Sequence, residues 1–176
     1  PARDDKVIAA WNGLAIAALA DAGVILGRGD YVDAAAATAA FVLDALVVDG
    51  RLRRAYMGGG AHQLGQLDDH ADLCHGLLTL YAATFHPRWL TAARELAGRM
   101  VELFADPEGG GFFYSGADGE ALVARTRDVE DHPTPAGGVL GELLPGRAEV
   151  GGQGHQPLLG AVVEVALDAP ALGLGA

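Results

Sequence analysis

The sequence has little cysteine and few basic residues. Cys74 stands alone, which excludes an internal disulfide, a paired-cysteine redox motif and a cysteine-rich zinc site. Lysine and arginine number 12 against 23 aspartates and glutamates, a net charge of −11. Because such a surface repels nucleic acid and anionic lipid, we expect neither as a partner. Apolar residues make up 51% of the chain, with aromatic residues only 6%, so the apolar content depends on alanine.

The length of 176 residues fits one domain with a substantial core. The apolar run 7–26 is about as long as a membrane span, but it contains Asn12 and Asp21 and has no strong basic flank. We therefore interpret it as a buried core helix and expect no membrane partner. The chain begins at Pro1 without a cleavage-site pattern, so we expect no signal peptide and a cytoplasmic location.

Four segments predict four helices, the first from helix-forming residues throughout an apolar run and the others from apolar residues at helical spacing. They cover residues 7–26, 31–46, 68–85 and 87–104. Asp30 is expected to cap the second helix, because aspartate is a favoured residue at that position. The segments 51–56 and 112–114, which lie beside glycine triplets, are expected to form short strands, the latter pairing with 122–123.

The helices form an internal repeat. Residues 31–35 match residues 89–93 at an offset of 58 residues, so each unit contains an inner helix, an outer helix and a small β excursion. Such units stack into a solenoid or a closed toroid, because one hairpin cannot bury its inner face alone. We expect residues 1–145 to form one domain of repeated hairpins. Glycines and prolines recur in 146–176 without helical spacing, which predicts a mostly irregular tail.

Several short motifs in this order resemble a known family. They are Asp5-Lys6, Trp11-Asn12-Gly13-Leu14, Leu67-Asp68-Asp69-His70-Ala71, Trp89-Leu90, Gly110-Gly111-Phe112-Phe113-Tyr114 and Thr134-Pro135-Ala136-Gly137. Together they are similar to the carboxy-terminal part of the YyaL-like thioredoxin-domain proteins, a group that includes the spermatogenesis-associated thioredoxin-like protein of animals. The resemblance covers about residues 3–144 and implies a toroid of six αα-hairpins, related to glycosidases and N-acylglucosamine 2-epimerases, after an amino-terminal thioredoxin-like domain.

The resemblance implies an all-α fold, an α/α toroid with short β-hairpin excursions, and a part in carbohydrate metabolism. Judged by the size of its repeats, the chain holds about half of a six-hairpin ring and lacks the thioredoxin-like domain, as a fragment would. His70 stands where the family usually has tyrosine, and Ala136 and Gly138 replace a serine and an asparagine. The resemblance fades beyond residue 144.

The inner helices of a toroid run parallel, so their amino ends gather at one mouth of the central funnel. We expect Asp5, Asp69 and Asp131 there as catalytic carboxyls, because one carboxyl can protonate a leaving oxygen while another activates water or attacks. Epimerisation would use a proton shuttle instead, for which His70 is a candidate. The expected substrate-binding residues are Trp11, Asn12, Asp68 and Thr134.

Each of these residues also has a plain structural alternative. An aspartate at a helix start can cap free N–H groups. Trp11 can stack on a sugar ring or fill core volume, and a buried Asn12 can bond a neighbouring backbone group or a ligand. Two hypotheses stay open: an enzyme-like carbohydrate domain, either hydrolase or epimerase, and a noncatalytic helical scaffold or truncated remnant. The histidine spacing favours no metal site, and no cofactor is expected. The open edge of a partial ring would favour self-association.

Overall fold

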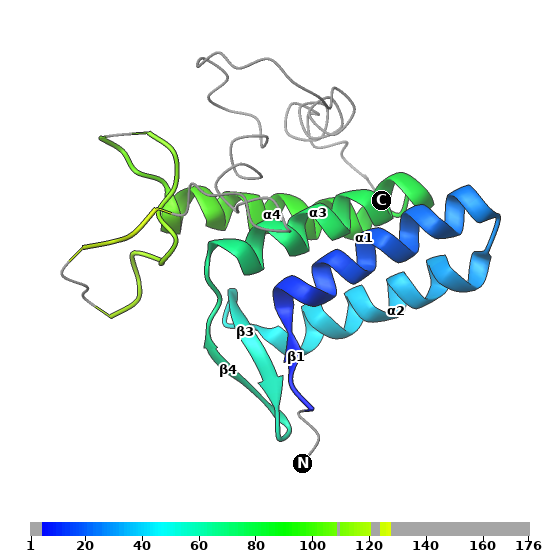
Figure 1. Cartoon of the computed structure of the whole chain (residues 1–176), viewed down its shortest axis with the longest axis horizontal. Helices are drawn as coiled ribbons and strands as arrows, with labels where there is room; N and C mark the ends of the chain where they lie inside the picture. The colour runs from blue at the N-terminus through cyan, green and yellow to red at the C-terminus, as the bar shows by residue number, and fades with distance from the viewer. Residues whose placement is uncertain (1–4, 109, 121–123, 128–176) are drawn as a thin grey trace, which may run out of the picture.

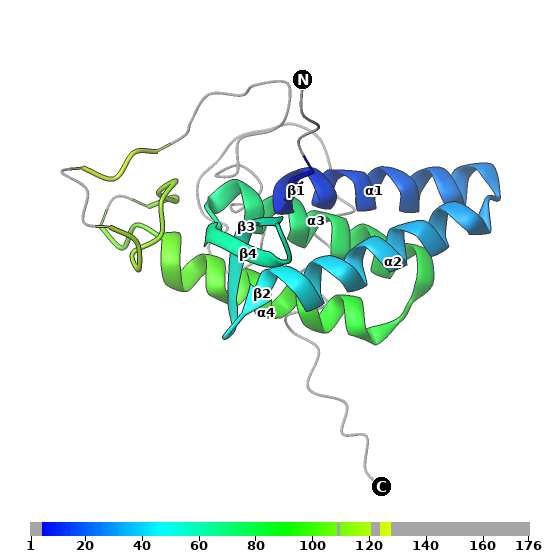
Figure 2. The ribbon, with the colours of Figure 1, turned by 90° about the horizontal axis from the view of Figure 1, so that it is seen from below.

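The computed structural model describes residues 5–108, 110–120 and 124–127. Within them, four helices of 18 residues each form two αα-hairpins (Figure 1). The first hairpin is α1 (Ala9–Leu26) with α2 (Gly29–Leu46), and the second is α3 (Leu67–Thr84) with α4 (Pro87–Phe104). The two inner helices, α1 and α3, lie side by side and run in the same direction, while α2 packs on α1 and α4 on α3 (Figures 1 and 2).

The second hairpin repeats the first with the predicted offset. α1 begins at Ala9 and α3 at Leu67, 58 residues later, and α2 and α4 are related by the same interval. The repeat therefore extends to the helix boundaries, and the all-α hairpin architecture is confirmed.

The inner helices cross where two glycines meet. A Cβ atom added to Gly76 of α3 would lie 2.4 Å from the carbonyl oxygen of Gly13 in α1, and one added to Gly13 would lie 2.4 Å from the backbone of Asp72. No side chain fits between backbones at this distance. The glycine of the Trp-Asn-Gly-Leu motif is thus required by close helix packing.

Helix ends follow the sequence signals in part. Gly27 adopts the left-handed conformation after α1, with φ of 64°, as expected of a glycine at that position. Pro87 opens α4, where its missing N–H costs nothing. The prediction that Asp30 caps α2 is wrong: Arg28 is the N-cap residue, and Asp30 lies inside the first turn, paired with the Arg28 guanidinium.

A small antiparallel sheet lies beside the amino ends of α1 and α3 (Figure 1). Its centre is β3 (Arg51–Met57), which pairs with β1 (Val7–Ile8) and β2 (Val47–Val48) along one edge and with β4 (Gly60–Leu64) along the other. The first helix is therefore two residues shorter than expected, because Val7 and Ile8 pair with Tyr56 and Ala55.

The predicted second β excursion is present in reduced form. A single bridge joins Ala105 to Phe112, at the place in the second unit where β2 pairs with β3 in the first. The expected partner segment 122–123 lies outside the described residues, as do residues 146–176 and the predicted domain boundary at 145.

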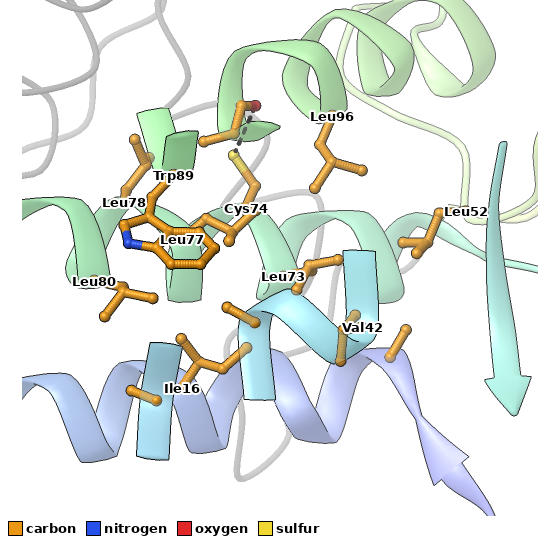
Figure 3. Close-up of a cluster of buried hydrophobic side chains, with 14 of the residues drawn as sticks. Ile16, Val42, Leu52, Leu73, Cys74, Leu77, Leu78, Leu80, Trp89 and Leu96 are labelled. Carbon is orange, nitrogen blue, oxygen red and sulfur yellow. Dashed lines mark hydrogen bonds between the residues drawn. The ribbon is translucent and has the colours of Figure 1, made fainter. Parts of the chain in front are cut away.

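The main core lies between the inner and outer helices (Figure 3). Ile16 of α1, Val42 of α2, Leu77 of α3 and Trp89 of α4 meet there with all or nearly all of their surface buried. Cys74 lies in the same cluster, where its Sγ contacts the Ala93 carbonyl at 3.5 Å and burial raises the pKa of its thiol to about 12. The lone cysteine is therefore a packing residue.

The buried face of α2 is narrow. Its fully buried positions are Ala35, Ala39, Val42 and Leu46, whereas Phe41 is 42% exposed. By length and composition α1 could cross a membrane, and 39% of its residues are buried within the structure. A core helix of a soluble protein passes the same test, so the absence of a membrane partner stays a prediction.

Candidate functional site

The amino ends of α1 and α3 are joined by one carboxylate. Asp69, at the third position of α3, accepts the backbone N–H of Ala10 in α1 at 3.2 Å and the N–H of Gln66, which precedes α3, at 2.9 Å. Its side chain is fully buried. These bonds satisfy N–H groups that a helix start leaves without partners. They also hold the amino ends of α1 and α3 together, and this region is called the mouth from here on.

Arg54 and Tyr114 complete a polar cluster around this carboxylate. Nη1 of Arg54, from β3, lies 3.1 Å from Oδ2 of Asp69 and 3.4 Å from Oδ1 of Asp68. The Tyr114 hydroxyl donates to Oδ2 of Asp68 at 3.3 Å, and the Tyr114 carbonyl accepts the N–H of Leu67, the first residue of α3. Asp68, whose side chain is 32% exposed, is the carboxylate of this cluster that faces solvent.

Burial and neighbouring charges shift the pKa values of the cluster. Burial and the adjacent Asp68 carboxylate raise the pKa of Asp69 to about 6, although its two N–H donors and Arg54 act in the opposite direction. Burial alone would lower the pKa of the Arg54 guanidinium, but Asp69 and Asp68 raise it above its ordinary value. At neutral pH the cluster therefore holds one cation between two carboxylates.

Asp72 is a carboxyl that the sequence reasoning missed. It lies one turn after Asp68 on the same face of α3, and only 6% of its surface is exposed. Burial, followed by the negative charges of Asp68 and Asp69, raises its pKa to about 7. The i, i+4 spacing from Asp68 on a helix was the signal that could have revealed it.

His70 is buried against α4 and both of its ring nitrogens have partners. Nδ1 lies 2.8 Å from the carbonyl oxygen of Gln66, so it carries the proton, and Nε2 accepts from Nη1 of Arg51 at 3.2 Å. Burial lowers the pKa of His70 to about 4, which keeps the ring neutral at physiological pH. These contacts fit a packing role, and the predicted role as a proton shuttle has no exposed ring nitrogen to serve it.

The other described residues of the predicted site lie at or before the amino end of α1. The Trp11 ring is 69% exposed, so the alternative that it fills core volume is wrong. Asn12 donates from Nδ2 to the Ile8 carbonyl at 2.8 Å, which is the local backbone bond held open as one of two alternatives. Asp5 is exposed, just before β1.

The structure brings together Asp68 and Asp69 and places the amino end of α1 beside them. Asp131 and Thr134 lie outside the described residues, so their expected place at the mouth stays a prediction. In the described part of the chain, no group of three or more His, Cys, Asp or Glu side chains is arranged to hold a metal ion.

A large groove lies away from this cluster. It has a volume of about 910 Å³ between α2, the β2–β3 segment and α4, with Leu43, Leu52 and Leu96 among its apolar lining and Arg88 and Arg99 among its polar lining. His70 reaches its inner end, but the carboxylates at the mouth do not line it. The groove therefore belongs to the outer side of the hairpins.

Sequence comparisons identify relatives of this region. The chain is 38% identical over 144 residues to mouse spermatogenesis-associated protein 20, an alignment that covers 76% of this chain and 18% of that protein. The human protein is 37% identical over 147 residues, covering 77% and 19%. An uncharacterized protein of Caenorhabditis elegans is 32% identical over 143 residues, covering 77% and 19%. No family model matches the chain.

These relatives confirm the resemblance drawn from the sequence motifs. The chain spans about a fifth of the length of the curated relatives it matches, so it corresponds to one portion of them.

Solved structures support the architecture. The chain resembles a cellobiose 2-epimerase from Spirochaeta thermophila with a TM-score of 0.63 at 17% identity, covering 78% of this chain and 36% of that one. It resembles a GH76 α-mannanase of Bacteroides thetaiotaomicron with a TM-score of 0.58 at 18% identity, covering 70% and 35%. At such low identity these likenesses show the fold alone, that of hairpins from an α/α toroid.

Proposed function

We propose that this chain is part of a carbohydrate-active toroid and that it contributes the sugar-facing mouth formed by the amino ends of α1 and α3. The observation that carries the proposal is the convergence of Asp68, Asp69, Arg54 and Tyr114 at that mouth. The solved structures of similar fold include a sugar epimerase and a mannanase, which supports a carbohydrate as the ligand class.

The cluster has the chemistry that a sugar site needs. The partly exposed Asp68 carboxylate can accept a hydrogen bond from a sugar hydroxyl or take its proton, while Arg54 and Tyr114 hold the carboxylate in place. The exposed Trp11 ring, from the adjacent helix end, offers an apolar face of the kind on which sugar rings stack. Hydrolysis and epimerisation both remain compatible with this set.

The experiment is a binding screen of the 176-residue chain against mono- and disaccharides, with calorimetry as the readout. Saturable binding is expected, and Asp68→Asn should weaken it about tenfold or more, because charged hydrogen bonds contribute about 1.5–3 kcal/mol. Asp68 is preferred to Asp69 for this test, since the buried Asp69 carboxylate also holds two helix ends. Asp33→Asn, an exposed change on α2, is the matched control.

The alternative is a noncatalytic helical scaffold. It is supported by the bonds of Asp69 to two helix starts and by the buried, fully partnered ring of His70. Absence of saturable binding to any sugar of the panel by the folded chain would leave the scaffold as the better account.

A further inference from the structure

One face of α3 carries polar residues along most of its length. Asp68, Asp72, His75 and Thr79 follow one another at steps of four, three and four residues, which places them on a single stripe. The stripe lies opposite the buried Leu73 and Leu77, which face the main core. It starts at the mouth described above and continues along the inner helix.

Asp72 is the unusual member of this stripe. Only 6% of its surface is exposed. Among the residues that the structure describes, no hydrogen-bond donor or cation contacts its carboxyl. The charges that act on it are the carboxylates of Asp68 and Asp69, and the Arg54 guanidinium beside them is already engaged by both. A carboxylate largely removed from water, beside two like charges and without a donor, is costly, and this cost favours the protonated form of the group.

We propose that Asp72 is a protonated carboxyl group that donates a hydrogen bond to a hydroxyl of an uncharged sugar, and that it selects such sugars over phosphorylated or uronic ones. The proposal rests on the carbohydrate function proposed above. In it, Asp72 is the residue that distinguishes uncharged from negatively charged sugars at the mouth.

The selection follows from the pairing of two carboxyls in different protonation states. An ionised Asp68 only accepts hydrogen bonds, and a protonated Asp72 donates one. A sugar hydroxyl does both, so one or two neighbouring hydroxyls satisfy this pair. A phosphate or carboxylate group would meet the negative charges of Asp68 and Asp69 in a site whose nearby cation is already paired.

The pH dependence has a defined sign. Burial, then Asp68 and Asp69, raises the pKa of Asp72 to about 7, so the donor is present below that pH and is lost as the pH rises through it. The other groups facing this part of α3 are Arg54, Tyr114 and the His75–Asp21 pair. Burial lowers the pKa of His75 and Asp21 opposes that shift, so His75 is neutral where Asp72 titrates.

The test compares Asp72→Asn with Asp72→Leu in the full chain, using glucose, mannose and cellobiose against glucose 6-phosphate and glucuronate. Calorimetry from pH 5 to 9 should show binding of uncharged sugars that weakens by up to tenfold per pH unit above about pH 7. Asp72→Asn keeps a neutral donor, so it should bind within a few-fold of the wild type at pH 6 and lose the alkaline decline. Asp72→Leu should lose about tenfold or more at pH 6.

Asp33→Asn is again the matched control, and carbon-13 titration of the Asp72 carboxyl provides a readout independent of binding. An Asp72 carboxyl that titrates near pH 4, an alkaline decline that persists in Asp72→Asn, or equal affinity for glucose 6-phosphate would overturn the proposal. If the wild type binds sugars and any of these results appears, only the role of Asp72 fails. If the folded wild type binds none of the sugars, the carbohydrate function itself fails and the role of Asp72 fails with it.

Discussion

At the scale of single residues, Asp69 shows how one buried carboxylate can join two helix starts. It accepts N–H groups at the starts of α1 and α3, and it also faces Arg54. The structural bonds use both of its oxygens, whereas Asp68 next to it keeps about a third of its side chain exposed. A ligand at the mouth would therefore meet Asp68 before Asp69.

Arg54 supports the charge of Asp69, and its removal should destabilise the chain in a pH-dependent way. Arg54→Met keeps the apolar stem and removes the guanidinium, which leaves a buried carboxylate without its cation. We expect a loss of about 2 kcal/mol at pH 7.5, below the value for a fully buried pair because the Arg54 side chain is 33% exposed. The loss should shrink below about pH 6, where Asp69 binds a proton and needs no cation.

Denaturant unfolding at pH 7.5 and at pH 5 measures this difference. Arg28→Ala, which removes the exposed partner of Asp30, is the control and should change the stability little at either pH. An equal loss for Arg54→Met at both pH values would show that Arg54 acts through packing, not through the Asp69 charge.

The sequence could indicate which carboxyls begin a helix but not what each one contacts. Asp68 and Asp69 were recognisable as a helix start, and the capping alternative for Asp69 is confirmed. The burial of Asp72 and His70 depends on how α3 faces its neighbours, which a single helix pattern does not determine. Trp11 shows the same limit, since the sequence left both stacking and core filling open and only the structure shows the ring exposed.

At the scale of elements, the contact between α1 and α3 sets the geometry of the mouth. Gly13 and Gly76 bring the two backbones together, which aligns the helix starts so that Ala10 reaches Asp69. Both glycines are visible in the sequence, but a glycine inside a helical pattern reads equally well as a weak point. Only the crossing of α1 and α3 shows that these two positions have no room for a side chain.

Replacing Gly76 with alanine should therefore destabilise the chain despite the better helix propensity of alanine. The new Cβ would lie 2.4 Å from the Gly13 carbonyl oxygen, and the obstacle is backbone that cannot rotate away. We expect a net loss of about 2 kcal/mol, since overpacking typically costs about 1–3 kcal/mol. Thermal and denaturant unfolding measure it.

Gly98→Ala on α4 is the matched control, because nothing lies within 4 Å of the position of its Cβ atom. This variant should gain about 0.5–1 kcal/mol from helix propensity alone. A Gly76→Ala variant as stable as Gly98→Ala would mean that the inner helices separate at no cost. The close crossing would then contribute nothing to the free energy of unfolding.

The short strands show why some elements escaped prediction. β1 has two residues, and β4 is rich in polar residues. Neither therefore has an alternation of apolar and polar residues long enough to predict a strand. They exist because β3 offers two edges beside the helix starts. The helices, by contrast, were predictable to within a few residues because each has five turns: α4 carries regular apolar spacing, and α1 is apolar almost throughout and ends before Gly27.

At the scale of the whole molecule, the chain represents a part of a ring. It covers 36% of the Spirochaeta thermophila epimerase and 18% of the mouse relative, so further hairpins would flank it in a protein of that length. In a closed toroid each inner helix has another inner helix on both sides, whereas among the described residues the one inner helix beside α1 is α3. The free side and the carboxyl end of α1 are accordingly apolar and exposed.

The isolated chain should therefore associate with a second copy through this end of α1. Val24, Ile25 and Leu26 are 60%, 79% and 63% exposed, and Phe85, at the equivalent end of α3, is 75% exposed. A monomer would leave these side chains in water, whereas a second copy would cover them. Sedimentation velocity should show a sedimentation coefficient that rises with concentration.

Ile25→Lys tests the surface without weakening the helix, because a cation in the last turn of α1 complements the helix dipole. It should shift the association toward the monomer by about tenfold or more in dissociation constant, since burying an isoleucine contributes about 1.5–3 kcal/mol. Val101→Lys is the matched control: it removes a residue that is 56% exposed on the outer helix α4 and should leave the association unchanged. A wild type that stays monomeric at every concentration would show that the exposed end of α1 needs no partner, and equal weakening by both lysine variants would place the contact elsewhere.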